Sequence, residues 1–386
     1  MTIFSLTEAE LRQRRSLKWC TYDPDVLPLW VAEMDSAVLP AVRASLDAAL
    51  DRGDTGYPYG TDYPDAYRAS AAARWGLHLE PHQLRLGGDV MNAVLCVLEA
   101  TTDPGDGIVI TAPVYPPFWQ VTGGYRRRTV PVALTPEGRL DLDALADAFA
   151  APDVTAFLLC SPHNPTGTVH TAAELTAVAE LCDAHGVQLV VDEIHAWLVD
   201  PGTDFVPTLS VPAAQRAVVV VSAGKSWNLA AFKAGLYIAG SEAGRVLRAL
   251  PPLATQSTGH LGAIAHATAL RDGQGWVDQV CAEVAENKRL LSDLLHALVP
   301  GARYRAQPGT YLAWVDCSAL GLDDPYRHFL DRGRVAFSGG RNFSPDHGQW
   351  VRINLAASPG MITQAVERMA IALRRSVGHS AESSRA

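Results

Sequence analysis

Short apolar runs alternate with helix-like stretches through the middle of this 386-residue chain. A helical pattern at 171–186 (TAAELTAVAELCDAHG) lies between two of these runs, which are 107–113 (GIVITAP), 154–162 (VTAFLLCSP), 187–193 (VQLVVDE) and 217–223 (AVVVVSA). The alternation predicts βαβ units, in which helices join the strands of a mostly parallel sheet. Four consecutive valines, Val218 to Val221, are typical of a strand buried on both faces. We therefore expect an α/β fold.

The C-terminal part has a different pattern, which predicts a smaller α+β domain. Apolar residues at three- and four-residue steps predict one long amphipathic helix that ends before Pro300, and strand candidates follow at 309–318, 335–340 and 349–356. A final helix is expected at 358–374. A chain of this length exceeds one typical core. The predicted layout has an N-terminal segment (1–48) that contributes to the small domain, a large domain (49–285), the C-terminal small domain (286–374) and a disordered tail (375–386).

Charge and composition restrict the classes of partner. The formal net charge of −9 argues against a nucleic-acid or anionic membrane surface. The N-terminus lacks the apolar core of a signal peptide, and no run approaches the roughly 18 apolar residues of a membrane span. The six cysteines include no CxxC pair, so neither a metal site of the zinc type nor a disulfide framework is indicated. We expect a cytoplasmic protein that acts on small molecules.

Polar residues follow three of the predicted strands. Asn164 lies beyond the run 154–162, Asp192 ends the next run, and Lys225 lies just beyond the valines. The separations of 28 and 33 residues each suit one βαβ unit of roughly 30 residues. Ligands of open α/β sheets bind outside the carboxyl ends of the strands. We therefore expect an amide, a carboxylate and an amine at one edge of one sheet.

Each of these residues alone also fits a structural role. Asp192 could cap a helix, Asn164 before Pro165 could start a turn, and Lys225 could extend to solvent. Gly224-Lys225-Ser226 also resembles the end of a phosphate-binding P-loop, GxxxxGK[ST]. Val219 stands where that motif requires glycine, which argues against a nucleotide hydrolase.

The stretches SPHNPTG, VDEIH and SAGKSWNLAAFK, in this order, resemble the fold type I pyridoxal-phosphate (PLP) enzymes of the class I/II aminotransferase superfamily. The resemblance covers nearly the whole chain. LPLWVAEMD at 27–35, His195 and the Trp-Asn pair after Lys225 are similar to the cystathionine β-lyase group, of the MalY/PatB type. This resemblance implies a large PLP-binding domain with a mostly parallel seven-stranded sheet flanked by helices, and a smaller α+β domain.

The resemblance also implies roles for the residues around the cofactor ring. Lys225 would form the Schiff base with PLP, and Asp192 would face the pyridine nitrogen, where a carboxylate keeps the ring protonated. Asn164 and His195 would reach the ring oxygen O3′, and Tyr115 would stack on the ring. His195 could instead make a structural hydrogen bond, and Tyr115 could be an ordinary core aromatic.

The phosphate of the cofactor would bind at the glycine-rich turn 87–90, which precedes an apolar helix pattern. A turn of this kind leading into a helix offers backbone N–H groups and a favourable dipole. Asp89 and Val90 would contribute main-chain contacts, and Ser222 and Lys233 side-chain contacts. Two features depart from the family pattern: an arginine is usual where Lys233 stands, and Asp89 places a carboxylate near the phosphate.

The remaining residues implied by the resemblance concern the substrate and a second subunit. Arg352 would bind the substrate α-carboxylate with a guanidinium fork, and Trp30 and Ala32 would line the pocket. Glu33 departs from the usual aspartate, and Arg352 could instead be structural. Tyr57 resembles a catalytic-site tyrosine that reaches the phosphate of the neighbouring subunit, which implies a homodimer with shared sites.

The expected function is β-elimination of a thiol from an S-substituted L-cysteine. L-cystathionine, a small amino acid with a thioether, would give pyruvate, ammonia and homocysteine. The alternative is a PLP-dependent aminotransferase, which shares the same residues up to removal of the Cα proton. A third alternative, a regulatory or scaffold protein that keeps the fold, is disfavoured by the set of Lys225, Asp192 and Arg352.

Overall fold

The computed structural model describes residues 2–383, and these form two compact units. The first unit comprises Met1–Ala37, Pro165–Gly167 and Gln279–Ala386, and the second comprises Val38–Asn164 and Thr168–Asp278. The boundaries predicted after residues 48 and 285 fall within the helices α3 (Pro40–Asp51) and α12 (Gln274–Leu298). The predicted domain layout stays a prediction.

The second unit is built on a seven-stranded sheet with the order β2-β8-β7-β6-β5-β3-β4. Every neighbouring pair from β4 to β7 is parallel, whereas β8 runs antiparallel to both β7 and β2. The predicted mostly parallel sheet is therefore confirmed. Its strands are β2 (Leu84–Gly87), β3 (Gly107–Ala112), β4 (Arg128–Ala133), β5 (Val154–Cys160), β6 (Gln188–Asp192), β7 (Val218–Val221) and β8 (Gly235–Ala239).

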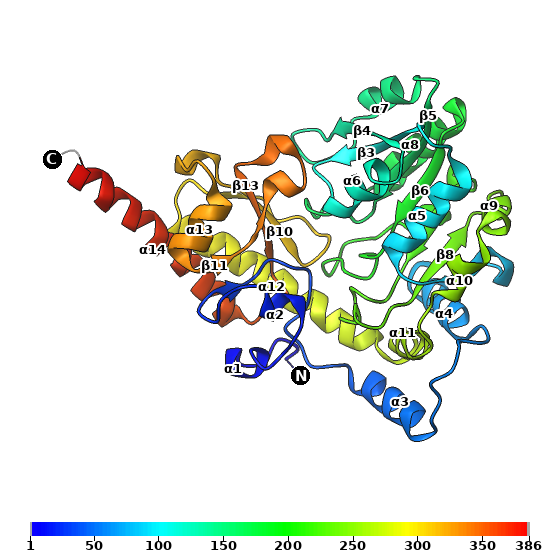
Figure 1. The fold of residues 1–386 in the computed structure, drawn as a ribbon, viewed down its shortest axis with the longest axis horizontal. Helices are drawn as coiled ribbons and strands as arrows, with labels where there is room; N and C mark the ends of the chain where they lie inside the picture. The colour runs from blue at the N-terminus through cyan, green and yellow to red at the C-terminus, as the bar shows by residue number, and fades with distance from the viewer. Residues whose placement is uncertain (1, 384–386) are drawn as a thin grey trace. The chain divides into compact units, whose positions relative to one another are not determined.

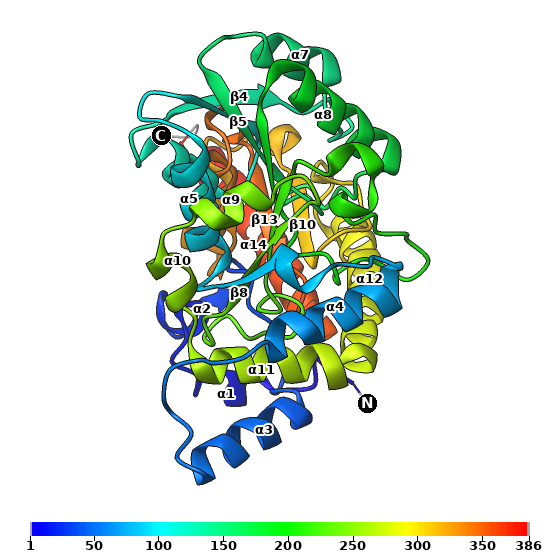
Figure 2. The ribbon, with the colours of Figure 1, turned by 90° about the vertical axis from the view of Figure 1, so that its right-hand side faces the viewer.

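Helices cover both faces of this sheet. One face packs against α5 (Val90–Thr101), α6 (Pro116–Gly123) and α9 (Gly244–Ala249), and alternate strand residues such as Ile108 and Ile110 share a core with Val94 of α5. The other face packs against α7 (Leu142–Phe149) and α8 (Ala172–His185) (Figures 1 and 2). The alternation follows from the two-residue period of a strand, which sends successive side chains to opposite faces.

The unit also contains α4 (Asp62–Trp75), α10 (Pro252–Gln256) and α11 (His260–Asp272), and α11 packs against both α3 and α4. The connection from β6 to β7 (193–217), all of which is described, contains no α-helix. It carries the 3-10 turns η2 (Thr208–Ser210) and η3 (Pro212–Ala214) instead. Pro207 and Pro212 explain this difference from a regular βαβ unit, because proline disrupts a helix interior.

The first unit contains an antiparallel sheet with the order β12-β13-β10-β9. Its core joins residues of β10 and β13 to the apolar faces of α12, α13 and α14. The elements are α1 (Glu8–Leu11), α2 (Leu17–Cys20), β9 (Arg303–Tyr304), β10 (Leu312–Asp316), α13 (Pro325–Gly333), β12 (Ser338–Gly339), β13 (Trp350–Asn354) and α14 (Pro359–Ser383), and the parallel pair β1 (Leu27–Pro28) and β11 (Val335–Ala336).

The C-terminal helix is longer than the sequence predicted. The backbone of α14 continues past Arg374 to Ser383, into the part predicted to be disordered. Each residue added to a formed helix gains a backbone hydrogen bond, which favours continuation. The last part of the predicted tail, 384–386, lies outside the described residues. Among the described helices, none is long and apolar enough to cross a bilayer.

Candidate active site

The sheet of the second unit brings three predicted site residues to its carboxyl edge. Asp192 ends β6 and pairs in register with Cys160 of β5 and Val220 of β7, so the three strands end at nearly the same level. Asn164 lies four residues beyond Cys160, and Lys225 lies four residues beyond the end of β7. An amide, a carboxylate and an amine therefore follow adjacent parallel strands.

Asp192 is a buried carboxylate whose ionised form is costly. Asp192 is 3% exposed, and its Oδ1 accepts a hydrogen bond of 2.9 Å from the backbone N–H of Ile194. Burial raises the pKa of Asp192 to about 7, and the hydrogen bond from Ile194 and the charge of Lys225 act in the opposite direction. A buried carboxylate is stabilised when it faces a cation. This position therefore suits a ligand that presents a positively charged group.

The loop after β7 holds Lys225 in place through its neighbours. The Ser222 hydroxyl donates to the carbonyl of Ala234 at 2.8 Å and accepts from the N–H of Gly224 at 3.0 Å. The indole of Trp227 donates to the carbonyl of Gly273 at 2.8 Å. The half-buried Lys225 thus lies on a loop that is anchored on both sides. A phosphate contact of Ser222 stays a prediction, and it requires the hydroxyl to turn away from Ala234.

A tyrosine that the sequence reasoning missed supports the same loop. Tyr63 of α4 is 1% exposed, and its hydroxyl lies 3.3 Å from Nδ1 of His266 in α11. Burial raises the pKa of Tyr63, and interactions with the backbone of Ala223 and the side chain of Ser222 oppose this rise. Tyr63 lies far from Ser222 in the chain, so no local pattern in the sequence connects them.

The turn 87–90 has the geometry of an anion-binding helix start, with one change. Asp89 is the N-cap of α5, and its carboxylate accepts from the backbone N–H of Asn92 at 2.9 Å. Val90 is the first residue of the helix and is buried. A Cβ at Gly88 would lie 2.5 Å from the Ser257 hydroxyl, so a side chain at this position would displace that hydroxyl. The side chain of Asp89 therefore caps the helix itself.

Lys233 balances the charge of this carboxylate. Its Nζ lies 3.0 Å from Oδ2 of Asp89, in a pair exposed to solvent. The pKa of Asp89 is nevertheless lowered, because hydrogen bonds from Asn92 and Lys233 outweigh the burial that would raise it. The pair places one positive and one negative group beside the start of α5, so the two departures from the family pattern occur together.

The other three predicted residues of this unit differ in exposure. His195 is 2% exposed and lies in the turn three residues after Asp192. Tyr115 is the N-cap of α6, three residues beyond the end of β3, and its ring makes an edge contact with Phe118 at 6.3 Å between centroids. Tyr57 lies between α3 and α4 and is 95% exposed. Tyr57 is therefore not gathered with the other side chains.

The predicted substrate residues lie in the first unit. Arg352 of β13 is 5% exposed, and its Nη2 donates to the carbonyl of Trp30 at 3.0 Å. Its guanidinium carbon lies 4.9 Å from the centre of the Phe343 ring. Ala32 is buried, and the Glu33 carboxylate accepts from the Ser16 hydroxyl at 2.6 Å. Glu33 therefore anchors its segment to the region before α2.

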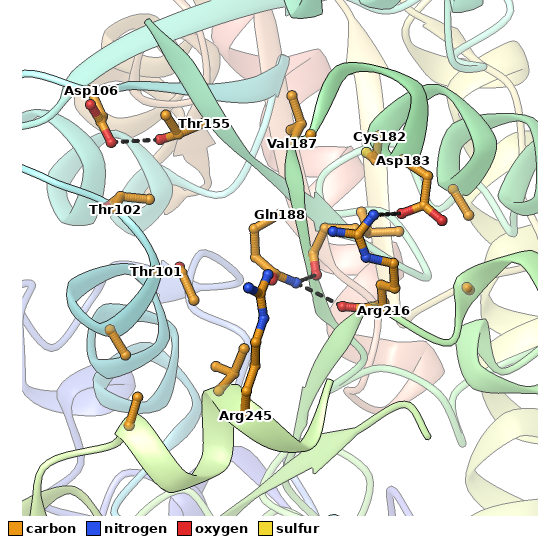
Figure 3. A pocket seen from close by; sticks show the side chains of 18 of the residues that line it. Thr101, Thr102, Asp106, Thr155, Cys182, Asp183, Val187, Gln188, Arg216 and Arg245 are labelled. Atoms are coloured by element: carbon orange, nitrogen blue, oxygen red, sulfur yellow. Dashed lines mark hydrogen bonds and ion pairs between the residues drawn. The ribbon is translucent and has the colours of Figure 1, made fainter. Parts of the chain in front are cut away.

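A cavity of about 610 Å³ lies near the amino ends of β5 and β6 in the second unit (Figure 3). It is lined by Thr155 and Gln188, which stand at the amino ends of β5 and β6, whereas Asp192 stands at the carboxyl end of β6. Arg216 in its wall pairs with Asp183 at 3.2 Å. Parallel sheets present their ligand sites at the carboxyl ends. The edge that carries Asp192 and Lys225 is therefore the candidate active site.

Relatives and solved structures resemble the chain over nearly its whole length. A Mycobacterium tuberculosis protein named "Putative cystathionine beta-lyase" is 44% identical, covering 95% of this chain and 97% of its own. Cystathionine beta-lyase PatB of Bacillus subtilis is 30% identical, covering 90% and 93%. A Corynebacterium diphtheriae structure described as a "putative plp-dependent beta-cystathionase" has a TM-score of 0.91 at 29% identity, covering 97% and 99%.

The match to a family model has nearly the same extent. The model described as aminotransferase class I and II matches residues 24–369, a range that includes every predicted site residue. The family match includes the strands and the sheet edge that carries Asn164, Asp192 and Lys225. The chain belongs to the aminotransferase class I and II family.

Proposed function

We propose that the protein is a PLP-dependent carbon–sulfur lyase. Its reaction would be the release of a thiol from an S-substituted L-cysteine such as L-cystathionine, with pyruvate, ammonia and homocysteine as products. The observation that carries the proposal is the placement of buried Asp192 between Asn164 and Lys225 at the carboxyl edge of the sheet. The names of the relatives favour the lyase over an aminotransferase.

The residues of this edge fit the chemical groups of PLP. Lys225 offers the amine that bonds the aldehyde, and the Asp192 carboxylate matches a protonated ring nitrogen. Asn164 and His195 suit the ring oxygen, and Tyr115 suits a face of the ring. The start of α5 and Lys233 supply donors and positive charge for the phosphate. When bound, PLP supplies an electron sink for the pair released at the substrate Cα.

The chain's own groups carry the proton and charge steps. Nζ of Lys225 takes the Cα proton, because a half-buried amine can act as a general base. The pair from the Cα–H bond forms the Cα–Cβ double bond, and the pair of the Cβ–S bond leaves with sulfur, which takes up a proton. One water then converts the remaining three-carbon unit to pyruvate and ammonia. Asp192 would hold the ring nitrogen of the cofactor and stabilise its positive charge.

Arg352 is proposed to bind the substrate α-carboxylate. Its guanidinium is buried and is already held along one edge by the Trp30 carbonyl. A planar fork fixed in this way can bind a carboxylate with two parallel hydrogen bonds, which sets the orientation of the substrate. Trp30 and Ala32 belong to the same segment and would line this part of the pocket.

A homodimer with shared sites is proposed from Tyr57. Tyr57 is 95% exposed in its own chain, so its ring is accessible to a second copy of the chain. Inactive Lys225→Ala and inactive Tyr57→Phe proteins, mixed and reassociated, should regain activity, because one site of the mixed dimer then has both native residues. No recovery, with exchange of subunits demonstrated, would contradict the shared site.

The decisive experiment uses the purified holoprotein and L-cystathionine without any 2-oxo acid. The lyase releases pyruvate and free thiol in equal amounts, and Lys225→Ala releases neither. Borohydride should attach the cofactor to Lys225, as read by peptide mass. Turnover that requires an added 2-oxo acid would establish the aminotransferase instead. A colourless protein that does not bind PLP would contradict both activities.

A further inference from the structure

Side chains hold the backbone carbonyls of the segment 29–36 in the first unit. This segment forms no helix, and its carbonyls accept hydrogen bonds from residues far away in the sequence. The donors are Arg352 Nη2 at 3.0 Å and Ser338 Oγ at 2.7 Å to Trp30 O, Asn354 Nδ2 at 2.8 Å to Val31 O, Tyr311 Oη at 3.1 Å to Ala32 O, and Asn354 Nδ2 at 2.7 Å to Glu33 O. Four consecutive carbonyls are therefore fixed by side chains.

Asn354 makes two of these hydrogen bonds, more than any of the other donors. It is 0% exposed, and its amide nitrogen donates to both Val31 O and Glu33 O. Its side-chain oxygen accepts from the N–H of Ala356 at 2.9 Å, and its backbone N–H donates to Leu29 O at 2.9 Å. An asparagine side chain offers two N–H donors and one carbonyl acceptor, and all three functions are used here.

Asn354 and Arg352 act on neighbouring peptide groups of the same segment. They stand two residues apart on β13, so their side chains leave the same face of the strand. Arg352 contacts the carbonyl of Trp30, and Asn354 contacts the next carbonyl, that of Val31. Asn354 therefore holds the peptide group next to the carbonyl that anchors the guanidinium of Arg352, and Ser338 Oγ bonds that carbonyl directly.

We propose that Asn354 is a positioning residue for the binding of an α-carboxylate. It fixes the backbone from Trp30 to Glu33, and through the Trp30 carbonyl it fixes the orientation of the Arg352 guanidinium. This inference rests on the proposed function, in which Arg352 binds the substrate carboxylate. Bidentate binding of a carboxylate depends on the plane of the fork, so a rotated guanidinium binds more weakly.

The chain offers a closely matched control. Asn287 of α12 is also buried, at 2% exposure, and its amide nitrogen donates to two carbonyls two residues apart, Leu355 O and Ala357 O, both at 2.9 Å. Asn287→Ala therefore loses two amide-to-carbonyl hydrogen bonds in the same unit. Asn354→Ala loses two of the same kind and also the bond that its oxygen accepts from Ala356. Both carbonyls that Asn287 bonds lie outside the segment 29–36.

The experiment titrates each holoprotein with L-alanine and with ethylamine, which is L-alanine without its carboxylate. The readout is the ligand concentration that gives half of the change in the visible absorbance of the cofactor. We expect Asn354→Ala to raise this concentration roughly tenfold for L-alanine, from the loss of the two hydrogen bonds to Val31 and Glu33, and to leave the value for ethylamine within twofold. Asn287→Ala should leave both values within twofold, while urea unfolding shows a similar loss of stability in both variants.

Each outcome decides the inference. Asn354 would be only structural if the half-maximal L-alanine concentration rose equally in the two variants. It would also be only structural if Asn354→Ala raised the half-maximal ethylamine concentration as much as that of L-alanine. If Asn354→Ala does not fold, Asn354→Ser keeps one donor and is judged by the same comparison, with a smaller expected rise for L-alanine alone. A native protein that binds L-alanine but cleaves no thioether overturns the proposed lyase and leaves the comparison valid. A native holoprotein that responds to neither ligand overturns both.

Discussion

Replacing Asp192 by asparagine tests whether the ionised carboxylate destabilises the cofactor-free protein. Asn has nearly the same shape but carries no charge, so the N–H of Ile194 keeps an oxygen acceptor. In the cofactor-free protein, burial raises the pKa of Asp192 from its ordinary 3.8 to about 7. The unfolded chain therefore loses this proton at lower pH than the folded chain, and the contribution of Asp192 to stability falls as pH rises from about 4 to 7.

The size of the effect follows from the two pKa values. The difference between 3.8 and about 7 corresponds to about 4 kcal/mol once Asp192 is fully ionised, and about 3 kcal/mol of this develops between pH 5 and pH 8. Asp192 is fully buried, so solvent screening removes little of it. Burial raises the pKa of neighbouring Glu193, and the charge of Asp192 raises it further. Removing that charge lowers the pKa of Glu193, which adds to the stability that Asp192→Asn gains at high pH.

The assay is urea unfolding of the cofactor-free proteins at pH 5, 6, 7 and 8, followed by tryptophan fluorescence at one protein concentration. Relative to the native protein, Asp192→Asn should gain about 3 kcal/mol in free energy of unfolding between pH 5 and pH 8. Saturating PLP should remove most of this gain, because the protonated ring nitrogen then faces the native carboxylate. Equal pH dependence of the two cofactor-free proteins would refute the reasoning.

Three further predictions concern charged residues and helix capping. Lys18→Met should lower the free energy of unfolding by about 3–5 kcal/mol in urea unfolding, because Asp35 lies 2.7 Å from Lys18 Nζ in the native protein and would stay buried without its cation. The double variant Lys18→Met with Asp35→Asn should recover most of this loss, and no recovery would contradict a stabilising buried pair. Asp89→Ala should cost about 1 kcal/mol by the same assay through loss of the α5 cap, and an unchanged midpoint would argue against capping. Lys233→Ala should change stability by less than about 1 kcal/mol, because its pair with Asp89 is exposed, while weakening PLP binding measured by fluorescence titration; unaltered affinity would remove Lys233 from the phosphate site.

Four strands of the large sheet, β3, β5, β6 and β7, were predictable because their residues are mostly apolar, whereas β2, β4 and β8 lie outside the predicted runs. The runs that end at Asp192 and Val221 form β6 and β7, and the polar residues that follow them lie at one edge, as the spacing indicated. The connection between these strands was less predictable. The spacing suggested a helical crossover, whereas Pro207 and Pro212 impose 3-10 turns.

The residues that support the site could not be found from local patterns. Asn354 contacts Val31 across 323 positions of the sequence, and Tyr63 of α4 interacts with Ser222 in the loop after β7. Such pairs depend on how separate elements pack, which neither composition nor periodicity encodes. The one available signal was the two-residue spacing of Arg352 and Asn354 in a predicted strand, which places both on one face.

The antiparallel direction of β8 has a consequence for the order of assembly. Because β7 and β8 are neighbours in both sequence and sheet, the loop that carries Lys225 can close through contacts between residues close together in the chain. Asn164 and Asp192 reach their places only when parallel strands from distant segments pair, and such pairings form slowly. The lysine loop can therefore form early in folding and its two partners later. Appearance of the bound cofactor's colour during refolding would then mark completion of the parallel sheet.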